Sequence, residues 1–190
     1  MHSVIGTGLL LLQGVACWPR PVLKPRHHIT GVELSQFHFK PYDLPIMSVS
    51  CTKDQAGDPD FECSMAFTWE DPNANNSSSQ CESQWEWDGV ESTTPTARNS
   101  SDNGFIVCAS NSTITPGNLF QFMFQTMDHP SNFSLLLSHT FVDSQDFPSP
   151  ERANLYGQAN ITLIVDQQTP TALTYVIPAP QQAEIVGITI

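Results

Sequence analysis

The feature that most constrains the fold of this 190-residue chain is an alternation of apolar and polar side chains in short runs. Within residues 62–69, for example, every second residue from Cys63 to Trp69 is apolar. A two-residue period is that of a β-strand with one buried face. The segments expected to form strands, about nine or ten in all, are residues 33–40, 46–51, 62–69, 82–88, 105–109, 119–126, 134–142, 160–166, 172–177 and 184–190.

The connections between these segments are rich in Asn, Ser, Asp, Gly and Pro, and no stretch has the spacing of an amphipathic helix. Residues 149–156 fit at most one helical turn, and residues 71–80 and 91–103 are expected to be long polar loops. Many short strands with such connections predict an all-β fold, an antiparallel β-sandwich or barrel. We expect residues 31–190 to form this one domain, stabilised by disulfides.

The spacing of four cysteines favours one disulfide pattern. Cys51 and Cys63 are equidistant from Gly57, so a hairpin there sets them opposite each other. Cys81 and Cys108 are likewise symmetric about the loop between them. The favoured pairs are Cys51–Cys63 and Cys81–Cys108, and the main rival joins Cys51 to Cys108 and Cys63 to Cys81. Four cysteines allow three connectivities, so spacing alone leaves the choice open.

The N-terminal segment has the composition of an export signal. Residues 1–17 contain a four-leucine run at 9–12 followed by small residues, which predicts a signal peptide cleaved after Ala16 or after Cys17. Residues 18–30, with three prolines and three basic residues, are expected to form an extended arm or pro-segment. With the cysteines, this leader predicts a secreted, extracellular protein.

Six sequons for N-linked glycosylation support the same compartment and indicate a eukaryotic secretory pathway. Since two of them overlap, only one of that adjacent pair is expected to carry a glycan. The candidate glycosylation sites are Asn75, Asn76, Asn99, Asn111, Asn132 and Asn160.

The charge of the chain argues against two classes of partner. The formal net charge is −12, and from Asp54 onward the only basic residues besides histidine are Arg98 and Arg152. Nucleic acids and anionic membrane surfaces both require clustered Lys and Arg. We therefore expect neither as a partner, and no apolar run is long enough to span a membrane.

The sequence carries no recognised catalytic motif, and neither a cofactor nor a metal is expected. There is no G-x-S-x-G, P-loop, H-E-x-x-H or C-x-x-C pattern. His139 lies on an apolar stripe, so it is either a core residue or a catalytic general base inside a cavity. Trp85 and Trp87 share a strand face and either belong to the core or form a platform that stacks a sugar. The acidic loop 54–62 lacks the EF-hand pattern and is expected to be solvated.

Several strand patterns resemble those of small secreted fungal β-barrel proteins typified by the major Alternaria allergen. The resemblance rests on F-x-W at residues 67–69, the strand 81–87, F-x-F-x-F at 120–124 and A-N-I-T-L at 159–163. It implies a compact β-barrel that acts outside the cell at a host or cell-wall interface, without catalytic residues. That family usually carries a cysteine near its last strand, whereas none follows Cys108 here. Its disulfide pattern is therefore not carried over.

These observations favour a secreted, glycosylated β-protein with a binding or effector-like role at the cell surface or host interface. One alternative is a lipocalin-like secreted enzyme, a cyclase or isomerase, that acts on a hydrophobic small molecule with His139 in its cavity. A second alternative is a carbohydrate-binding module that uses Trp85 or Trp87. The corresponding partners are a protein, a small hydrophobic ligand or a glycan.

Overall fold

The computed structural model describes residues 34, 37–90, 104–108, 117–144, 147 and 151–190. The expected signal peptide 1–17 and arm 18–30 lie outside these residues, whereas Gly31–Ile190 clusters as one compact unit. No helix in the described ranges is long and apolar enough to cross a membrane. The strands are β1 (Tyr42–Thr52), β2 (Phe61–Asp71), β3 (Ser77–Trp87), β4 (Ile106–Val107), β5 (Leu119–His129), β6 (Asn132–Val142), β7 (Arg152–Thr162), β8 (Ile164–Gln168), β9 (Ala172–Val176) and β10 (Gln181–Thr189).

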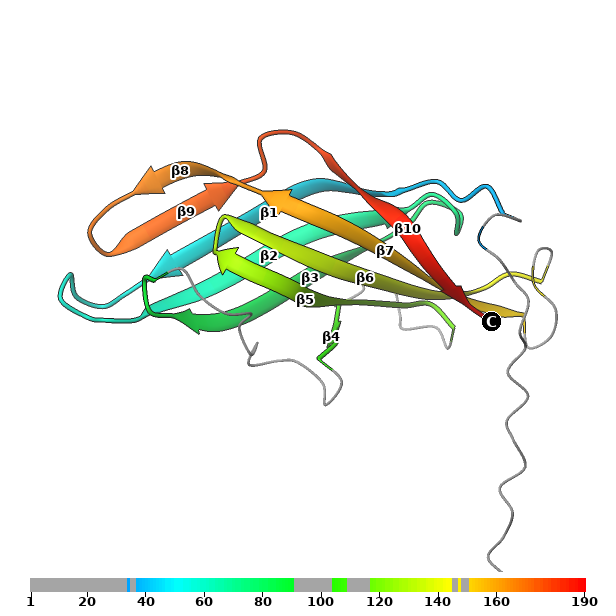
Figure 1. The fold of residues 1–190 in the computed structure, drawn as a ribbon, viewed down its shortest axis with the longest axis horizontal. Coiled ribbons are helices and arrows are strands. Elements are labelled where there is room, and N and C mark those ends of the chain that lie inside the picture. Colours follow the sequence, from blue (N-terminus) through cyan, green and yellow to red (C-terminus); the bar gives the residue numbers. More distant parts are fainter. Residues whose placement is uncertain (1–33, 35–36, 91–103, 109–116, 145–146, 148–150) are drawn as a thin grey trace, which may run out of the picture. The chain divides into compact units, whose positions relative to one another are not determined.

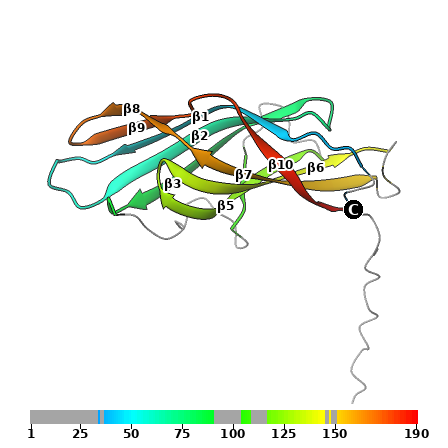
Figure 2. The ribbon, with the colours of Figure 1, turned by 45° about the horizontal axis from the view of Figure 1, so that its top comes forward.

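Eight of these strands form a nearly closed antiparallel barrel, in the order β3-β2-β1-β10-β7-β6-β5-β4 (Figure 1). The remaining two form the β8–β9 hairpin, in which β9 pairs with β1. One edge of β1 pairs with β2, and the other edge is shared by two strands. On that edge β1 pairs with β10 through residues 42–44 and with β9 through residues 48–52. Figures 1 and 2 both show the hairpin continuing the sheet beside β1. The predicted all-β, antiparallel fold is confirmed.

Side chains at alternate strand positions fill the interior of the barrel, as the sequence period requires. Phe120 and Phe122 of β5 are at most 2% exposed and face the inner side of β2. The ring of Phe122 meets Phe67 edge to face at 5.0 Å between centroids, and Phe120 meets Trp69 at 4.8 Å. Such pairs add about 0.5–1.5 kcal/mol each to the burial of apolar area. The interior between these strands is therefore occupied by aromatic side chains.

Two disulfides stabilise the barrel in different ways, and the favoured pairing is confirmed. Cys51 and Cys63 are register partners on the adjacent strands β1 and β2, with 4.0 Å between their Cα atoms. Cys81 on β3 bonds Cys108, which follows β4 and donates its backbone N–H to the carbonyl of Phe120. Because β3 and β4 stand at opposite ends of the strand order, the second disulfide links the two ends covalently.

The prediction of a long loop over residues 71–80 is wrong. β2 continues to Asp71 and β3 begins at Ser77, which leaves only residues 72–76 as a turn. Ser77 pairs with Asp71 and Ser79 pairs with Trp69, so cross-strand pairing maintains a strand that has no apolar signal of its own. The helical turn considered for 149–156 is also wrong from Arg152 onward, because β7 begins there opposite Val142.

Two other expected strands differ from the structure. The described part of segment 33–40 is not a strand, although Phe37 and Phe39 still stack on each other, with 5.1 Å between ring centroids. The expected strand 160–166 divides at Leu163, whose backbone N–H donates to the carbonyl of Ser131. At this residue the chain leaves the pairing with β6 and enters the pairing with β9.

Candidate functional site

A polar pocket opens at one end of the barrel, which we call the mouth. Three segments form it: the turn between β2 and β3, the residues just before β5, and the end of β6 with the residues that follow it. The pocket has a volume of about 460 Å³, within the range of small-molecule sites. Its lining among the described residues is Asn73, Ala74, Asn75, Ser77, Gly117, Asn118, Phe141, Val142, Asp143 and Ser144.

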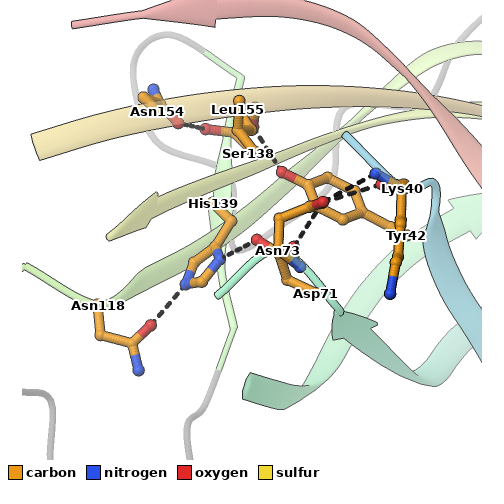
Figure 3. A network of polar contacts seen from close by, with 9 residues as sticks. All are labelled: Lys40, Tyr42, Asp71, Asn73, Asn118, Ser138, His139, Asn154 and Leu155. Atoms are coloured by element: carbon orange, nitrogen blue, oxygen red, sulfur yellow. Dashed lines mark hydrogen bonds and ion pairs between the residues drawn. The ribbon is translucent and has the colours of Figure 1, made fainter. Parts of the chain in front are cut away.

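His139 lies behind the wall of this pocket, on the inner face of β6. Its side chain is fully buried, and the ring of Phe120 stacks on it at 3.8 Å between centroids. Nδ1 lies 2.7 Å from Oδ2 of Asp71, and Nε2 lies 2.5 Å from Oδ1 of Asn118 (Figure 3). Each ring nitrogen therefore has an oxygen partner within hydrogen-bonding distance, one on a carboxylate and one on an amide. His139 and Asp71 thus form a buried hydrogen-bonded pair.

Asp71, the last residue of β2, is as deeply buried as its partner. Its second oxygen accepts hydrogen bonds from the backbone N–H and the side-chain amide of Asn73, at 2.8 and 2.9 Å. The Asn73 amide in turn bonds both the N–H and the carbonyl of Lys40. A continuous chain of polar contacts therefore runs from the segment before β1 to Asn118 on the pocket wall (Figure 3).

Tyr42 closes the inner side of this chain. Its hydroxyl donates to the backbone carbonyl of Leu155 at 3.0 Å. Burial, and secondarily the negative charge of Asp71, raise the pKa of Tyr42 far above its ordinary range, so the phenol stays neutral. The ring packs closely against Gly157, where a Cβ atom would lie 2.6 Å from it. The polar chain is thus shielded from water on its inner side.

Asn118 and Asn73 are the members of this polar chain that line the pocket, and Asn118 is the one bonded directly to His139. Gly117 before it has a φ of +107°, and a Cβ atom there would lie 2.6 Å from Cγ2 of Val142. Only glycine therefore lets the backbone pass Val142 and place Asn118 in the wall. His139 itself has no open nitrogen and no exposed surface, so it orients Asn118 rather than contacting a molecule in the pocket.

The chemistry of the mouth is that of neutral and negative hydrogen-bonding groups. Side-chain amides come from three asparagines, hydroxyls from Ser77 and Ser144, and a carboxylate from Asp143. The Ser77 hydroxyl is buried and makes no hydrogen bond within the structure. None of the described lining residues is Lys, Arg or His. This lining matches a ligand that both donates and accepts hydrogen bonds and carries no negative charge.

The tryptophans singled out in the sequence lie away from the mouth. Trp85 is 1% exposed and packs against Phe124, so neither face of its indole reaches solvent. Trp87 is half-buried: its ring lies against Phe61 and His129, and its Nε1–H donates to the carbonyl of Val90. The structure brings neither tryptophan together with His139.

Four of the six candidate glycosylation sites are described, and all four are exposed. Asn75 and Asn76 occupy the turn between β2 and β3, Asn132 begins β6, and Asn160 lies on the outer face of β7. The other two, Asn99 and Asn111, lie outside the described residues.

A second hollow, of about 370 Å³, lies at the other end of the barrel and is rich in carboxylates. We call it the acidic end, and its lining residues are Thr52, Lys53, Asp54, Asp58, Pro59, Asp60, Glu62 and Glu86. Lys53 donates to the carbonyl of Asp58 and lies over the ring of Phe61. Within the described ranges, no three His, Cys, Asp or Glu side chains are grouped in a way that suits a metal ion.

Sequence reasoning selected His139 but missed Asp71, Asn73 and Asn118. A signal for Asp71 was present: continuing the apolar face of residues 63–69 by one further step reaches this carboxylate. A buried strand face that ends in Asp, like one that contains His, indicates a partner for the charge.

The two disulfides indicate an oxidising compartment. Comparison of the chain with known protein families, with curated proteins and with solved structures finds no match. The resemblance to the Alternaria allergen family therefore extends only to a disulfide-bonded antiparallel β-barrel, and no family is identified.

Proposed function

We propose that this chain is an extracellular binding protein, with an effector-like role at a cell surface or host interface, and that the mouth binds its ligand. The leader, the sequons and the disulfides support the compartment. A rigid β-barrel that presents a pocket on its connecting segments is a common architecture for recognition.

The observation that carries the proposal is the buried Asp71–His139 pair behind Asn118. Burying polar side chains costs free energy that their mutual hydrogen bond only offsets, and apolar side chains of similar volume often stabilise a core as well or better. Here the pair is coupled to a residue of the pocket wall through a hydrogen bond of 2.5 Å. Fixing the orientation of a polar side chain in advance reduces the entropy lost when a ligand binds. The pair therefore fits a role in positioning Asn118.

The lining supports a neutral, hydroxyl-rich ligand such as a short glycan. Asparagine amides offer a donor and an acceptor side by side, which suits the hydroxyl groups of a sugar. Asp143 and the net charge of −12 disfavour anions. An apolar ligand would leave the wall amides without partners.

The enzyme and tryptophan-platform alternatives receive less support. His139 has both nitrogens engaged and no exposed surface, so a cyclase or isomerase lacks an available base there. Aromatic pairs such as Phe67–Phe122 occupy the interior where a lipocalin holds its ligand. A carbohydrate role is better served by the mouth than by Trp85, which is buried.

The test is calorimetric titration with neutral oligosaccharides derived from chitin, β-glucan and mannan. We expect one class to bind the deglycosylated protein, and Asn118→Ala to abolish the heat of binding. Gln84→Ala, an exposed site on β3, is the matched control and should bind like the wild type. Binding that survives Asn118→Ala in a folded protein would refute the mouth as the site, and absence of binding by every class would refute the glycan ligand.

A further inference from the structure

Two overlapping sequons lie beside the mouth, and they are not equivalent. Asn75 is a lining residue of the pocket, whereas Asn76 is not among the described lining residues. Both side chains are exposed, and both residues have left-handed backbone conformations, with φ of 54° and 52°. A glycan on one residue therefore starts at the pocket rim, and a glycan on its neighbour starts outside it.

We infer that the choice of sequon sets whether the mouth is open: a glycan on Asn75 covers the pocket, and a glycan on Asn76 leaves it accessible. An N-glycan is bulky and hydrophilic, and its first sugar is neutral and rich in hydrogen-bonding groups. Its chemistry therefore matches the amides and hydroxyls of the lining. This inference rests on the proposed function of the mouth and adds its regulation.

The turn that carries both sequons is fixed to the barrel, so a glycan root cannot swing away from the rim. The N–H of Ala74 donates to the carbonyl of Asp71 at 3.3 Å, and the N–H of Ser77 donates to the carbonyl of Ala74 at 3.0 Å. The amide of Asn73 anchors the same turn to both Asp71 and Lys40. The attachment point on Asn75 is held in place by the same contacts that position the pocket wall.

The hydroxyl residues of the two sequons differ in accessibility. Ser77 completes the sequon of Asn75, and its Oγ is buried in the folded protein. Ser78 completes the sequon of Asn76 and is exposed. Modification at Asn75 must therefore precede folding of the turn, whereas the sequon of Asn76 stays accessible afterwards. The relative rates of folding and glycosylation then determine the proportion of open and covered molecules.

The experiment assigns the glycan to one sequon at a time and measures access to the pocket. The full chain is secreted from a eukaryotic host with Ser78→Ala, which leaves only the Asn75 sequon of this overlapping pair, or with Asn75→Gln, which leaves only the Asn76 sequon of the pair. Each variant also carries Ser144→Cys at the pocket rim. The labelling rate of the new thiol with a maleimide probe is compared before and after enzymatic removal of glycans. The control position is Gln168→Cys on β8. Gln168 pairs with Leu173, which pairs with Cys51 toward the acidic end of the barrel.

We expect the glycan on Asn75 to slow labelling at position 144 severalfold, with full recovery after its removal. The glycan on Asn76 should leave that rate unchanged, and labelling at position 168 should not respond to either glycan. Equal rates with and without the Asn75 glycan overturn the inference, as does a Ser78→Ala protein whose mass shows Asn75 unmodified. Failure of the proposed function is seen separately, as a deglycosylated protein that binds none of the oligosaccharides.

Discussion

The two ends of the barrel both carry ionisable groups, but they place them differently. At the mouth, Asp71 and His139 are fully buried and bonded to each other. At the acidic end, more carboxylates gather, yet each is exposed or half-buried: Asp54, Asp58, Asp60, Glu62 and Glu86. Carboxylates in water need no partner to stay charged, whereas buried ones do. Burial, and not the number of charges, therefore distinguishes the end at which we propose the binding site.

The largest difference between the ends is expected from removing one carboxylate at each. Asp71→Ala removes the hydrogen-bond partner of the buried His139 ring and of the Asn73 amide, and it should lower the free energy of unfolding by about 2–4 kcal/mol. Asp60→Asn at the acidic end should change it by less than about 0.5 kcal/mol. Urea unfolding at neutral pH measures both. Similar small losses in the two variants would show that the pair contributes no more than a surface charge.

A double variant separates stability from positioning. Asp71→Leu combined with His139→Phe replaces the buried polar pair by apolar side chains, and it should recover most of the stability lost in Asp71→Ala. It removes the hydrogen bond that orients Asn118, so oligosaccharide binding should stay lost. Recovery of binding together with stability would mean that the pair does not position the wall.

A smaller contrast is expected between a methyl group added inside the barrel, against Tyr42, and one added at the acidic end. In Gly157→Ala the new Cβ would lie 2.6 Å from the ring of Tyr42, so the ring must shift. Overpacking of this kind costs about 1–3 kcal/mol. Gly57→Ala in the β1–β2 connection meets nothing within 4 Å and should be neutral within about 0.5 kcal/mol. Thermal unfolding of both variants tests the contrast, which fails if Gly157→Ala is also neutral.

The strands and disulfides could be predicted from the sequence because their signals are local. A two-residue period marks each apolar face, and the equal spacing of Cys51 and Cys63 around a turn predicts their pairing. Ser77 and the residues after it carry no such signal, because their strand exists only through pairing with β2. From sequence alone, a polar segment of this kind is predicted to be a loop, because the strand with which it pairs is not known.

The candidate site was predictable only in part, for a related reason. His139 was found because a histidine on an apolar stripe is conspicuous. Its partners Asp71 and Asn118 lie 68 and 21 residues away in the chain. Spacing along one chain does not reveal which distant polar residues meet. The site is assembled by the antiparallel order of the strands, which brings the end of β2, the start of β5 and the end of β6 to one end of the barrel.

A contrast that depends on pH follows from the two buried tyrosines. The pKa of Tyr42 is raised far above about 10, by burial first and by Asp71 second, so its phenol stays protonated in the folded protein while it ionises in the unfolded chain. This contribution to the free energy of unfolding is complete below about pH 10, the ordinary pKa of tyrosine. It is lost as the pH rises above that value, by about 1.4 kcal/mol per pH unit. Tyr42→Phe should not show this contribution to the alkaline loss of stability. At neutral pH the variant should be less stable than the wild type by about 1 kcal/mol, because the hydrogen bond to Leu155 is missing.

The control for Tyr42 is Tyr175, which packs against His129 toward the acidic end. Burial alone raises the pKa of Tyr175, so Tyr175→Phe should reduce the alkaline loss by less than Tyr42→Phe does. Urea unfolding between neutral and alkaline pH gives the two slopes. Equal slopes in the two variants would show that the pKa of Tyr42 is not raised more than that of Tyr175.

The smallest effect is expected from two buried hydroxyls of β3 that make no hydrogen bond in the structure, those of Ser77 and Ser83. Removing an unpaired buried hydroxyl relieves a desolvation cost, so Ser77→Ala and Ser83→Ala should each stabilise the protein, by no more than about 1 kcal/mol. Only Ser77 lines the pocket. Its hydroxyl is nevertheless buried, so Ser77→Ala should bind oligosaccharide as Ser83→Ala does and leave Asn118 to carry recognition. Weaker binding by Ser77→Ala alone would contradict this and would mean that the hydroxyl becomes accessible and serves recognition.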